Sequence, residues 1–384
     1  ALFNPSIVEA PDQSGLTAGE KRVVISFRAT GESHISSIVF RTGVLDEKGK
    51  IRLDPPGNYT CQGKVKHPNK DRKGAFRELL QQMELPEDIR PNILNQLHDS
   101  FTYKEMEGAL KNSLKRIKSA SEKNKVKYDI LSLVNISYEL EFDESSRLSE
   151  RVIFPVTFTE KNGIEDARFV RFTEKSGSVR YIATYTAYDG SFILPQLIET
   201  KDFRHFKISP LHGKVAINKN LALFPRKING KYAMISRIDG VNNYIMFSND
   251  LYLWEKANLL QTPRYPWEYV QVGNGGSPIE TEKGWLIITH GVGPMRKYCL
   301  GASLFDLNDP TIELGRLKEP ILIPQPNERD GYVPNVVYTC GAMVHNDLLL
   351  LPYAVSDHAS SFATIHLPEL LDAILASSEE GSLP

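Results

Sequence analysis

A repeated hairpin pattern runs through most of this chain and limits the folds that it can form. Each copy has a turn of Gly, Asn, Asp or Lys, a short apolar run, a polar or aromatic tip and a second run, and the copies begin near residues 21, 180, 229, 283 and 346. Short β-forming runs between such turns are typical of antiparallel hairpins. Copies two to five start roughly 50 to 60 residues apart, the length of a four-stranded propeller blade. We therefore expect an all-β, five-bladed β-propeller, with a β-sandwich of irregular hairpins as the alternative.

The gap between the first two copies is longer and changes character. Between residues 64 and 125, apolar residues recur at helical spacing, and Pro86 and Pro91 punctuate the groups. The sequence predicts a helical insertion between the first and second blades of a single domain that spans residues 1–384. We consider three roles for it: a structural cap, a lid over the active site, or a contact in a homo-oligomer.

The charged residues nearly balance, because 46 Lys and Arg against 47 Asp and Glu give a net charge of −1. A dedicated binder of nucleic acid or of an anionic membrane is usually basic, so we expect neither partner. The apolar runs are too short to cross a bilayer. Three widely spaced cysteines, Cys61, Cys299 and Cys340, indicate neither a disulfide framework nor a metal site. We expect a cytoplasmic location, or a periplasmic one if a leader was trimmed.

The expected blade tips carry polar residues of both charges. These tips hold Arg28, Tyr188 with Asp189, Arg237, His290, and Ser356 with Asp357. In a propeller they would meet at an axial funnel. Carboxylates suit sugar hydroxyls and Arg or His suits an anion, so the set indicates a carbohydrate or phosphate ligand. The cluster Glu32-Ser33-His34 has no further ligand at metal spacing, and we expect no metal ion.

Two adjacent carboxylates, Glu165 and Asp166, precede Arg168 and an apolar run. Neighbouring residues of a strand point to opposite faces, so these two carboxylates should not share one role. One can face the funnel while the other pairs with an arginine. The alternative is an ordinary solvated ion pair.

Together these segments resemble glycoside hydrolase family 130, the β-mannoside phosphorylases and related β-mannosidases. The resemblance is carried by residues 3–5, 163–168, 185–190, 218–225, 284–291, 298–301 and 333–337, with Arg237 and Asp357. It covers nearly all of the chain except the helical insertion. It implies the five-bladed propeller fold and an inverting reaction on a β-mannoside.

The resemblance also implies roles for individual residues. Asp166 matches the general acid, which in the family acts through the 3-hydroxyl of the mannosyl unit. Phosphate would be held by Lys219, Arg237, His290 and Tyr298, and the sugar by Asn4, Arg28, Asp189 and Asp357. An inverting phosphorylase needs only one catalytic carboxylate, because the anion replaces the base and water of a hydrolase. The expected co-substrate is therefore inorganic phosphate, with no other cofactor.

Four positions depart from the family pattern. Gln271 stands in place of a Lys, Ser236 of a His, Ala167 of a Pro and Asn220 of an acidic residue. Three potential cations remain at the phosphate site if His290 is protonated, and one is lost.

Three functions stay open on these residues. The leading one is an inverting phosphorylase that cleaves a β-mannoside of an oligosaccharide with phosphate and releases mannose 1-phosphate. The second is an inverting β-mannosidase, favoured by Gln271, in which Glu280 or Glu268 would activate water. The third is a non-catalytic carbohydrate-binding propeller, against which the positioned acid Asp166 argues.

Overall fold

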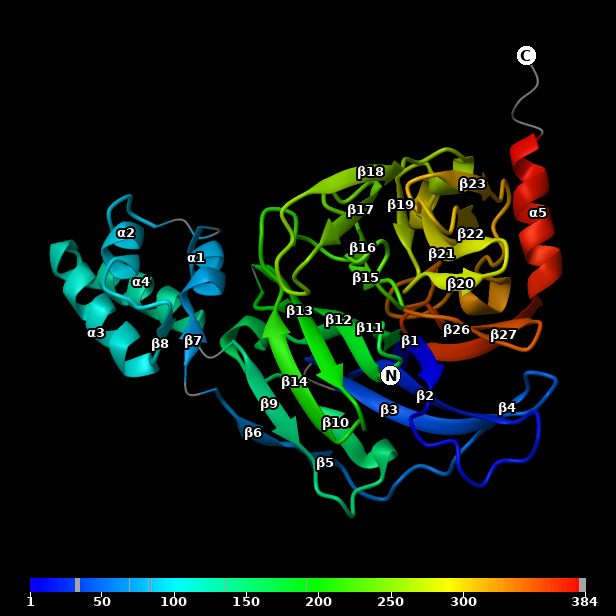
Figure 1. Cartoon of the computed structure of the whole chain (residues 1–384), viewed down its shortest axis with the longest axis horizontal. Coiled ribbons are helices and arrows are strands. Elements are labelled where there is room, and N and C mark those ends of the chain that lie inside the picture. The colour runs from blue at the N-terminus through cyan, green and yellow to red at the C-terminus, as the bar shows by residue number, and fades with distance from the viewer. Residues whose placement is uncertain are drawn as a thin grey trace.

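The computed structural model of the chain describes residues 1–31, 35–68, 70–81, 83, 85–134, 136–190 and 192–379. Within these ranges the protein is mostly β, with five sheets of four to six strands, one two-stranded sheet and few helices. Figure 1 shows the large sheets grouped together on one side of the molecule. The expected all-β class is confirmed in this coarse form. The cluster Glu32-Ser33-His34 lies outside the described residues.

The first two large sheets use strands from both sides of the helical segment. The first sheet contains β1 (Leu2–Glu9), β2 (Lys21–Thr30), β3 (Ser36–Leu45), β4 (Ile51–Leu53), β5 (Cys61–Gln62) and β10 (Arg151–Ile153). The second contains β6 (Lys64–Lys66), β9 (Tyr138–Glu141), β11 (Ile164–Thr173), β12 (Val179–Tyr188), β13 (Ile193–Thr200) and β14 (His205–Pro210).

The other three sheets are built from consecutive strands. The third contains β15 (Ala222–Leu223), β16 (Tyr232–Ser236), β17 (Asn243–Ser248) and β18 (Ala257–Gln261). The fourth contains β19 (Gln271–Asn274), β20 (Ile279–Thr281), β21 (Gly284–Val292), β22 (Tyr298–Phe305) and β23 (Glu313–Arg316). The fifth contains β24 (Val337–Tyr338), β25 (Met343–His345), β26 (Leu348–Val355) and β27 (Ala359–His366), and α5 (Leu367–Glu379) packs against the fourth.

The middle strand β21 of the fourth sheet is apolar on both faces, because this sheet packs against the third sheet on one side and the fifth on the other. All nine residues of β21 are buried. Trp285 packs with Phe224 of the third sheet, whereas its neighbour Leu286 belongs to a cluster with Leu351 of the fifth. A strand covered on both faces gives a continuous apolar run instead of an alternating one. This explains the repeated runs in the sequence.

The first and fifth sheets are neighbours, although they stand at opposite ends of the chain. The backbone N–H of Cys340 donates to the carbonyl of Pro5 at 2.8 Å, and Ser6 forms a parallel bridge with Gly341. Strand β1 also packs against β26 and β27. The two chain ends therefore share a sheet-to-sheet contact.

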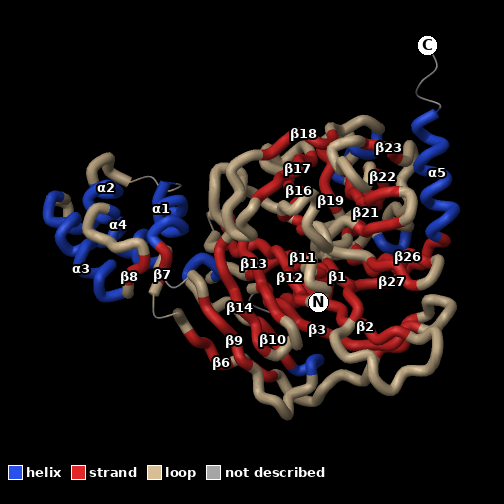
Figure 2. The backbone as a smooth tube through the Cα atoms, in the orientation of Figure 1, coloured by secondary structure: helices blue, strands red, loops and turns tan. Residues whose placement is uncertain are grey.

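The helical segment forms a lobe beside the sheets (Figures 1 and 2). It contains β7 (Asp71–Arg72), α1 (Lys73–Gln81), α2 (Ile89–Leu94), β8 (Ser100–Phe101), α3 (Tyr103–Ser113) and α4 (Ala120–Ser132). Its apolar side chains make a core of their own around Phe101, Met106 and Ile130. Thr102 caps α3 with a capping box completed by Glu105.

The lobe is connected to the edge of the second sheet. Strands β6 and β9, on either side of it in the sequence, pair with each other, with Val65 opposite Leu140. Residues 64–66 therefore belong to the sheet, and the helices span 73–132 instead of filling the expected range 64–125. The prediction placed the end of the helical segment too early, because α4 has only a weak apolar stripe among several lysines. Tyr128 of α4 meets Phe158 edge-on, with ring centroids 4.7 Å apart.

We expect the lobe to unfold locally as a unit, because its core is distinct from those of the sheets. Met106 is fully buried in that core, and a Met→Ala change in such a place costs about 2–5 kcal/mol. Met106→Ala should speed amide hydrogen exchange across residues 73–132 and leave β11–β13 unchanged. Glu107→Ala, at an exposed position of the same helix, is the control. Equal loss of protection in β11–β13 would contradict an independent lobe.

Candidate functional site

The predicted site residues lie at matching ends of the strands. In each large sheet the first two inner strands are antiparallel, so the start of one lies beside the end of the other. In the first sheet Phe3 is opposite Arg28, and in the fourth Gly273 is opposite His290. The contacts described below connect these ends across the sheets.

Asp166 and Asn4 form the first of these contacts. The side-chain amide of Asn4 donates to Oδ1 of Asp166 at 2.7 Å. Both residues have left-handed backbones, with φ of 50° for Asn4 and 58° for Asp166, and each lies where the strand pairing shifts register. Such bulges re-aim side chains and recur at functional sites. A register shift with a left-handed residue thus occurs in both the first and the second sheet, and it brings these two side chains together.

Glu165 is the carboxylate that carries the ion pairs. Its Oε1 accepts from Arg28 at 2.8 Å and its Oε2 accepts from Lys219 at 2.8 Å. Its side chain is only 11% exposed. Arg28 lies 3.9 Å from Oδ1 of Asp166 as well. The division of labour expected for the two neighbouring carboxylates is therefore present: Glu165 binds the cations, and Asp166 is held by an amide.

Arg168 lies beside this cluster in the sequence of β11 and bonds to two other sheets, the fourth and the fifth. It is 3% exposed. It donates to Oδ1 of Asn274 at 3.0 Å and to the hydroxyl of Tyr338 at 2.6 Å. Asn220 donates to the same hydroxyl at 3.0 Å. Sequence reasoning missed Asn274 and Tyr338, because neither position differs from ordinary turn or strand residues before folding.

His290 is held in its neutral form in this site, so it does not add the positive charge that its protonation would have supplied. Its Nδ1 lies 3.1 Å from the carbonyl of Asn274, so Nδ1 carries the hydrogen and Nε2 faces Arg237 at 3.4 Å. Burial holds the pKa of His290 well below its usual value, and the charges of Arg237 and Arg168 lower the pKa further. Its ring stacks with that of Tyr298 at a centroid distance of 6.0 Å.

Arg237 keeps part of its guanidinium free. Its Nε is buried and has no hydrogen-bond partner. With the Gln271 amide oriented to suit its neighbours, the Gln271 oxygen accepts from Arg237 at 2.6 Å and its nitrogen donates to the carbonyl of Gly240 at 3.3 Å. Gln271 therefore orients the arginine, where a lysine would have added a second positive charge beside it.

Asp357 follows β26 in a strained turn, in which Ser356 and Asp357 have φ of 47° and 52°. Burial raises the pKa of Asp357 to about 6, and repulsion from Asp166 contributes to the shift. Asp189 follows β12, where its carboxylate accepts from the backbone N–H of Phe192 at 2.6 Å. Asp357 thus interacts with the Asp166 cluster, while the geometry of Asp189 is that of a turn residue.

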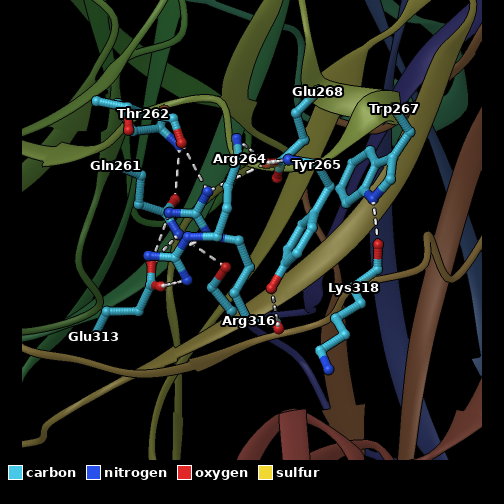
Figure 3. A network of polar contacts seen from close by, with 11 residues as sticks. Gln261, Thr262, Arg264, Tyr265, Trp267, Glu268, Glu313, Arg316 and Lys318 are labelled. Carbon is cyan, nitrogen blue, oxygen red and sulfur yellow. Dashed lines mark hydrogen bonds and ion pairs between the residues drawn. The ribbon is translucent and has the colours of Figure 1, made fainter. Parts of the chain in front are cut away.

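The two carboxylates considered as alternative bases are held elsewhere. Glu280 accepts from Nε and Nη2 of the exposed Arg226 guanidinium, at 2.8 and 2.7 Å. It lies opposite Trp285, five residues along β21 from His290, which corresponds to roughly 17 Å of strand. Glu268 is fully buried and pairs with Arg316 at 3.2 Å in the network of Figure 3. In the described part of the chain, neither carboxylate bonds to a residue of the Asp166 cluster.

Metal binding is not indicated by the same side chains. Among the residues that the structure describes, no three His, Cys, Asp or Glu side chains gather as metal ligands would. No helix within these residues is long and apolar enough to cross a membrane.

The ion pairs of Glu165 with Arg28 and Lys219 should contribute more to the free energy of unfolding than a surface ion pair does. Glu165→Gln removes the partner of Arg28 and Lys219 while keeping the side-chain size, and we expect the free energy of unfolding to fall by up to about 3 kcal/mol. Glu280→Gln breaks a half-exposed pair with Arg226, and its cost should be about 1 kcal/mol or less. Denaturant unfolding of both variants measures the difference, and equal costs would contradict the structural role of Glu165.

The raised pKa of Asp357 has a consequence for stability. Between about pH 4, near the ordinary pKa of an aspartate, and about pH 6, the folded chain retains a proton that the unfolded chain has released. This contribution to stability is therefore complete below that window and lost as the pH rises through it. Denaturant unfolding of the wild type and of Asp357→Asn should show a free-energy difference that falls across the window. Parallel profiles would contradict the assignment.

Sequence comparison adds an independent finding. The profile of glycoside hydrolase family 130, described as beta-1,4-mannooligosaccharide phosphorylase, matches residues 123–375. The chain is 34% identical over 228 residues to the beta-1,2-mannobiose phosphorylase of Listeria innocua, covering 57% of this chain and 62% of that protein. It is 35% identical over 228 residues to the 1,2-beta-oligomannan phosphorylase of a Thermoanaerobacter species, covering 58% of this chain and 75% of that protein. The match thus spans less than two thirds of the Listeria relative.

Structural comparison extends the similarity to the N-terminal part. The structure of the Listeria innocua enzyme in complex with beta-1,2-mannobiose has a TM-score of 0.57 and 24% identity, covering 98% of this chain and 92% of that chain. At this identity the similarity concerns the fold, and its coverage shows that it extends well into the residues that precede the profile match. Since the profile itself covers more than half of the sequence, the chain belongs to glycoside hydrolase family 130.

Proposed function

We propose that this protein is an inverting phosphorylase that cleaves a β-mannoside with inorganic phosphate and releases mannose 1-phosphate. Two relatives that are 34% and 35% identical to the chain over 228 residues are named as phosphorylases of β-linked mannosides. Asp166 is the acid in this proposal. Its carboxylate is held by Asn4 and lies beside Arg28, while Glu165 takes the ion pairs that would otherwise occupy it.

The observation that carries the proposal is a pair of arginines without carboxylate partners. Among the described residues, neither Arg168 nor Arg237 forms an ion pair with an acidic side chain. Their partners are the neutral groups of Asn274, Tyr338, His290 and Gln271. Removing a guanidinium from water without an anion is costly. A bound phosphate would supply the missing negative charge, and the free Nε of Arg237 is a donor for it.

The proposed reaction moves one proton and one glycosyl group. A phosphate oxygen attacks the anomeric carbon from the side of Arg237, and the bond to the leaving oxygen breaks on the opposite face. Asp166 supplies the proton to that oxygen, by way of the sugar 3-hydroxyl in the manner implied by the family. The neutral His290 accepts at Nε2, so it can take a hydrogen bond from a protonated phosphate oxygen but adds no charge.

We also propose that the five large sheets are the blades of a five-bladed propeller around this site. The contact of Pro5 with Cys340, which joins the first and fifth sheets, supports a closed ring. The bonds of Arg168 to Asn274 and Tyr338 support a common axis, because they link the second sheet to the fourth and fifth. The sugar would lie above Asp166, between Asn4 and Arg28 on one side and Asp189 and Asp357 on the other.

A hydrolase on the same scaffold remains the second candidate, and one observation favours it. Because Gln271 replaces a lysine of the family pattern, the anion site has one positive charge fewer. The base would then be Asp357, whose pKa is raised by burial and, to a lesser extent, by the nearby charge of Asp166, because Glu280 and Glu268 are bound to arginines elsewhere.

Product analysis separates the two candidates. The protein is incubated with β-1,2- and β-1,4-linked mannobiose, with and without phosphate, and we expect mannose 1-phosphate formed only with phosphate. Arg237→Lys should raise the phosphate KM on the order of tenfold or more while changing the sugar KM much less, because an ammonium cannot grip two phosphate oxygens in parallel. Asp166→Asn is the inactive control. Free mannose formed equally well in phosphate-free buffer would exclude the phosphorylase.

A further inference from the structure

A cavity of about 480 Å³ lies against the fourth sheet, beside the loop that joins β21 to β22. Its wall includes Pro266, Trp267, Lys297, Cys299, Glu319 and Gln325. No step of the proposed reaction uses these residues. Its volume lies in the range of ligand pockets, and it combines an apolar wall with a few charged and amide groups.

One strand separates the cavity from the proposed active site. Tyr298 and Cys299 are successive residues of β22, and successive residues of a strand point to opposite faces. Tyr298 stacks on His290, whereas Cys299 lines the cavity. A ligand in the cavity would therefore lie one strand away from the anion site.

The ring of Trp267 is held in a fixed position in the cavity wall. A Cβ on Gly291 or Gly301 would come within 2.5 Å or less of atoms of the ring, so only glycine allows the ring to lie this close to β21 and β22. The indole N–H donates to the carbonyl of Lys318 at 2.8 Å (Figure 3). The indole thus contributes an aromatic surface to the cavity wall, and its single polar atom is already satisfied.

The loop at the rim of the cavity is strained and exposes an apolar side chain. Met295 and Arg296 have left-handed backbones, with φ of 60° and 52°. Met295 is 89% exposed. Strain of this kind costs on the order of 1–3 kcal/mol per residue and persists where the surrounding structure holds it, often at ligand sites. The loop joins β21 to β22 and so borders both the cavity and the anion site.

We propose that this cavity is a second saccharide-binding site, which holds mannose units of the substrate remote from the cleaved bond. The proposal rests on the proposed function, since the ligand is the extension of the same oligosaccharide. Sugars present an apolar C–H face and a rim of hydroxyls. The Trp267 ring suits the face, with the exposed Met295 in the adjoining loop, and Glu319, Lys297 and Gln325 suit the hydroxyls.

Chain-length dependence tests this proposal. Phosphorolysis of β-linked mannobiose and mannotetraose is measured for the wild type, Glu319→Ala and Met295→Ala. We expect kcat/KM for mannotetraose to fall about three- to tenfold in each variant, the loss of one or two net hydrogen bonds or contacts, while that for mannobiose stays unchanged. Glu282→Ala, an exposed position in the turn at the other end of β21, is the matched control and should change neither value.

A binding measurement makes the result independent of turnover. Mannotetraose and mannobiose are titrated into Asp166→Asn protein by calorimetry, and the tetrasaccharide should bind more tightly, with the advantage lost in Glu319→Ala. Equal losses for both chain lengths, or no change for either, would overturn the second site. Absence of any phosphate-dependent cleavage of mannobiose would instead reject the proposed function, and the titration would still report on the cavity.

Discussion

The buried guanidinium of Arg168 is the interaction on which the rest of the site depends. It extends from the second sheet and bonds to Asn274 of the fourth and Tyr338 of the fifth, while Asn220, just before β15, donates to the same Tyr338 hydroxyl. Three sheets thus meet at one cation whose hydrogen-bond partners are neutral. Its charge helps to hold His290 neutral. The cost of burying it without an anionic partner is the physical basis on which we propose an anion site here.

A second constraint fixes where the inner strands begin. Single helical turns end in Glu160, Glu268 and Glu328 just before the second, fourth and fifth sheets, and each carboxylate accepts backbone N–H groups of its own turn. Glu160 also accepts from the hydroxyls of Tyr138 and Tyr185, and Glu268 from Arg316. A buried carboxylate bound in this way determines how the following strand enters the site. The contacts of Glu268 therefore favour a structural role over the role of a catalytic base.

Much of the site could be predicted because its residues stand in distinctive local motifs. The pair Glu165 and Asp166 was separable by strand alternation alone, and the resemblance to the family then pointed to Asp166. Other features depend on partners distant in the chain. His290 is neutral because Asn274 and two arginines surround it, and Glu165 bridges Arg28 and Lys219, which lie 137 and 54 positions away from it. The helical lobe was recognised by its spacing, but its boundaries depended on the pairing of β6 with β9.

The sequence by itself determined the hairpin repeat, the mostly β class and the membership of a family with a positioned acid. Those properties reside in local periodicity and in short motifs, which a chain carries before it folds. Only the tertiary structure decided which cations remain unpaired, that Glu280 lies at the far end of its sheet, and that burial, together with the nearby Asp166, raises the pKa of Asp357. Charge and proton affinity depend on distance and burial, and these are set by contacts between sheets that lie far apart in the sequence.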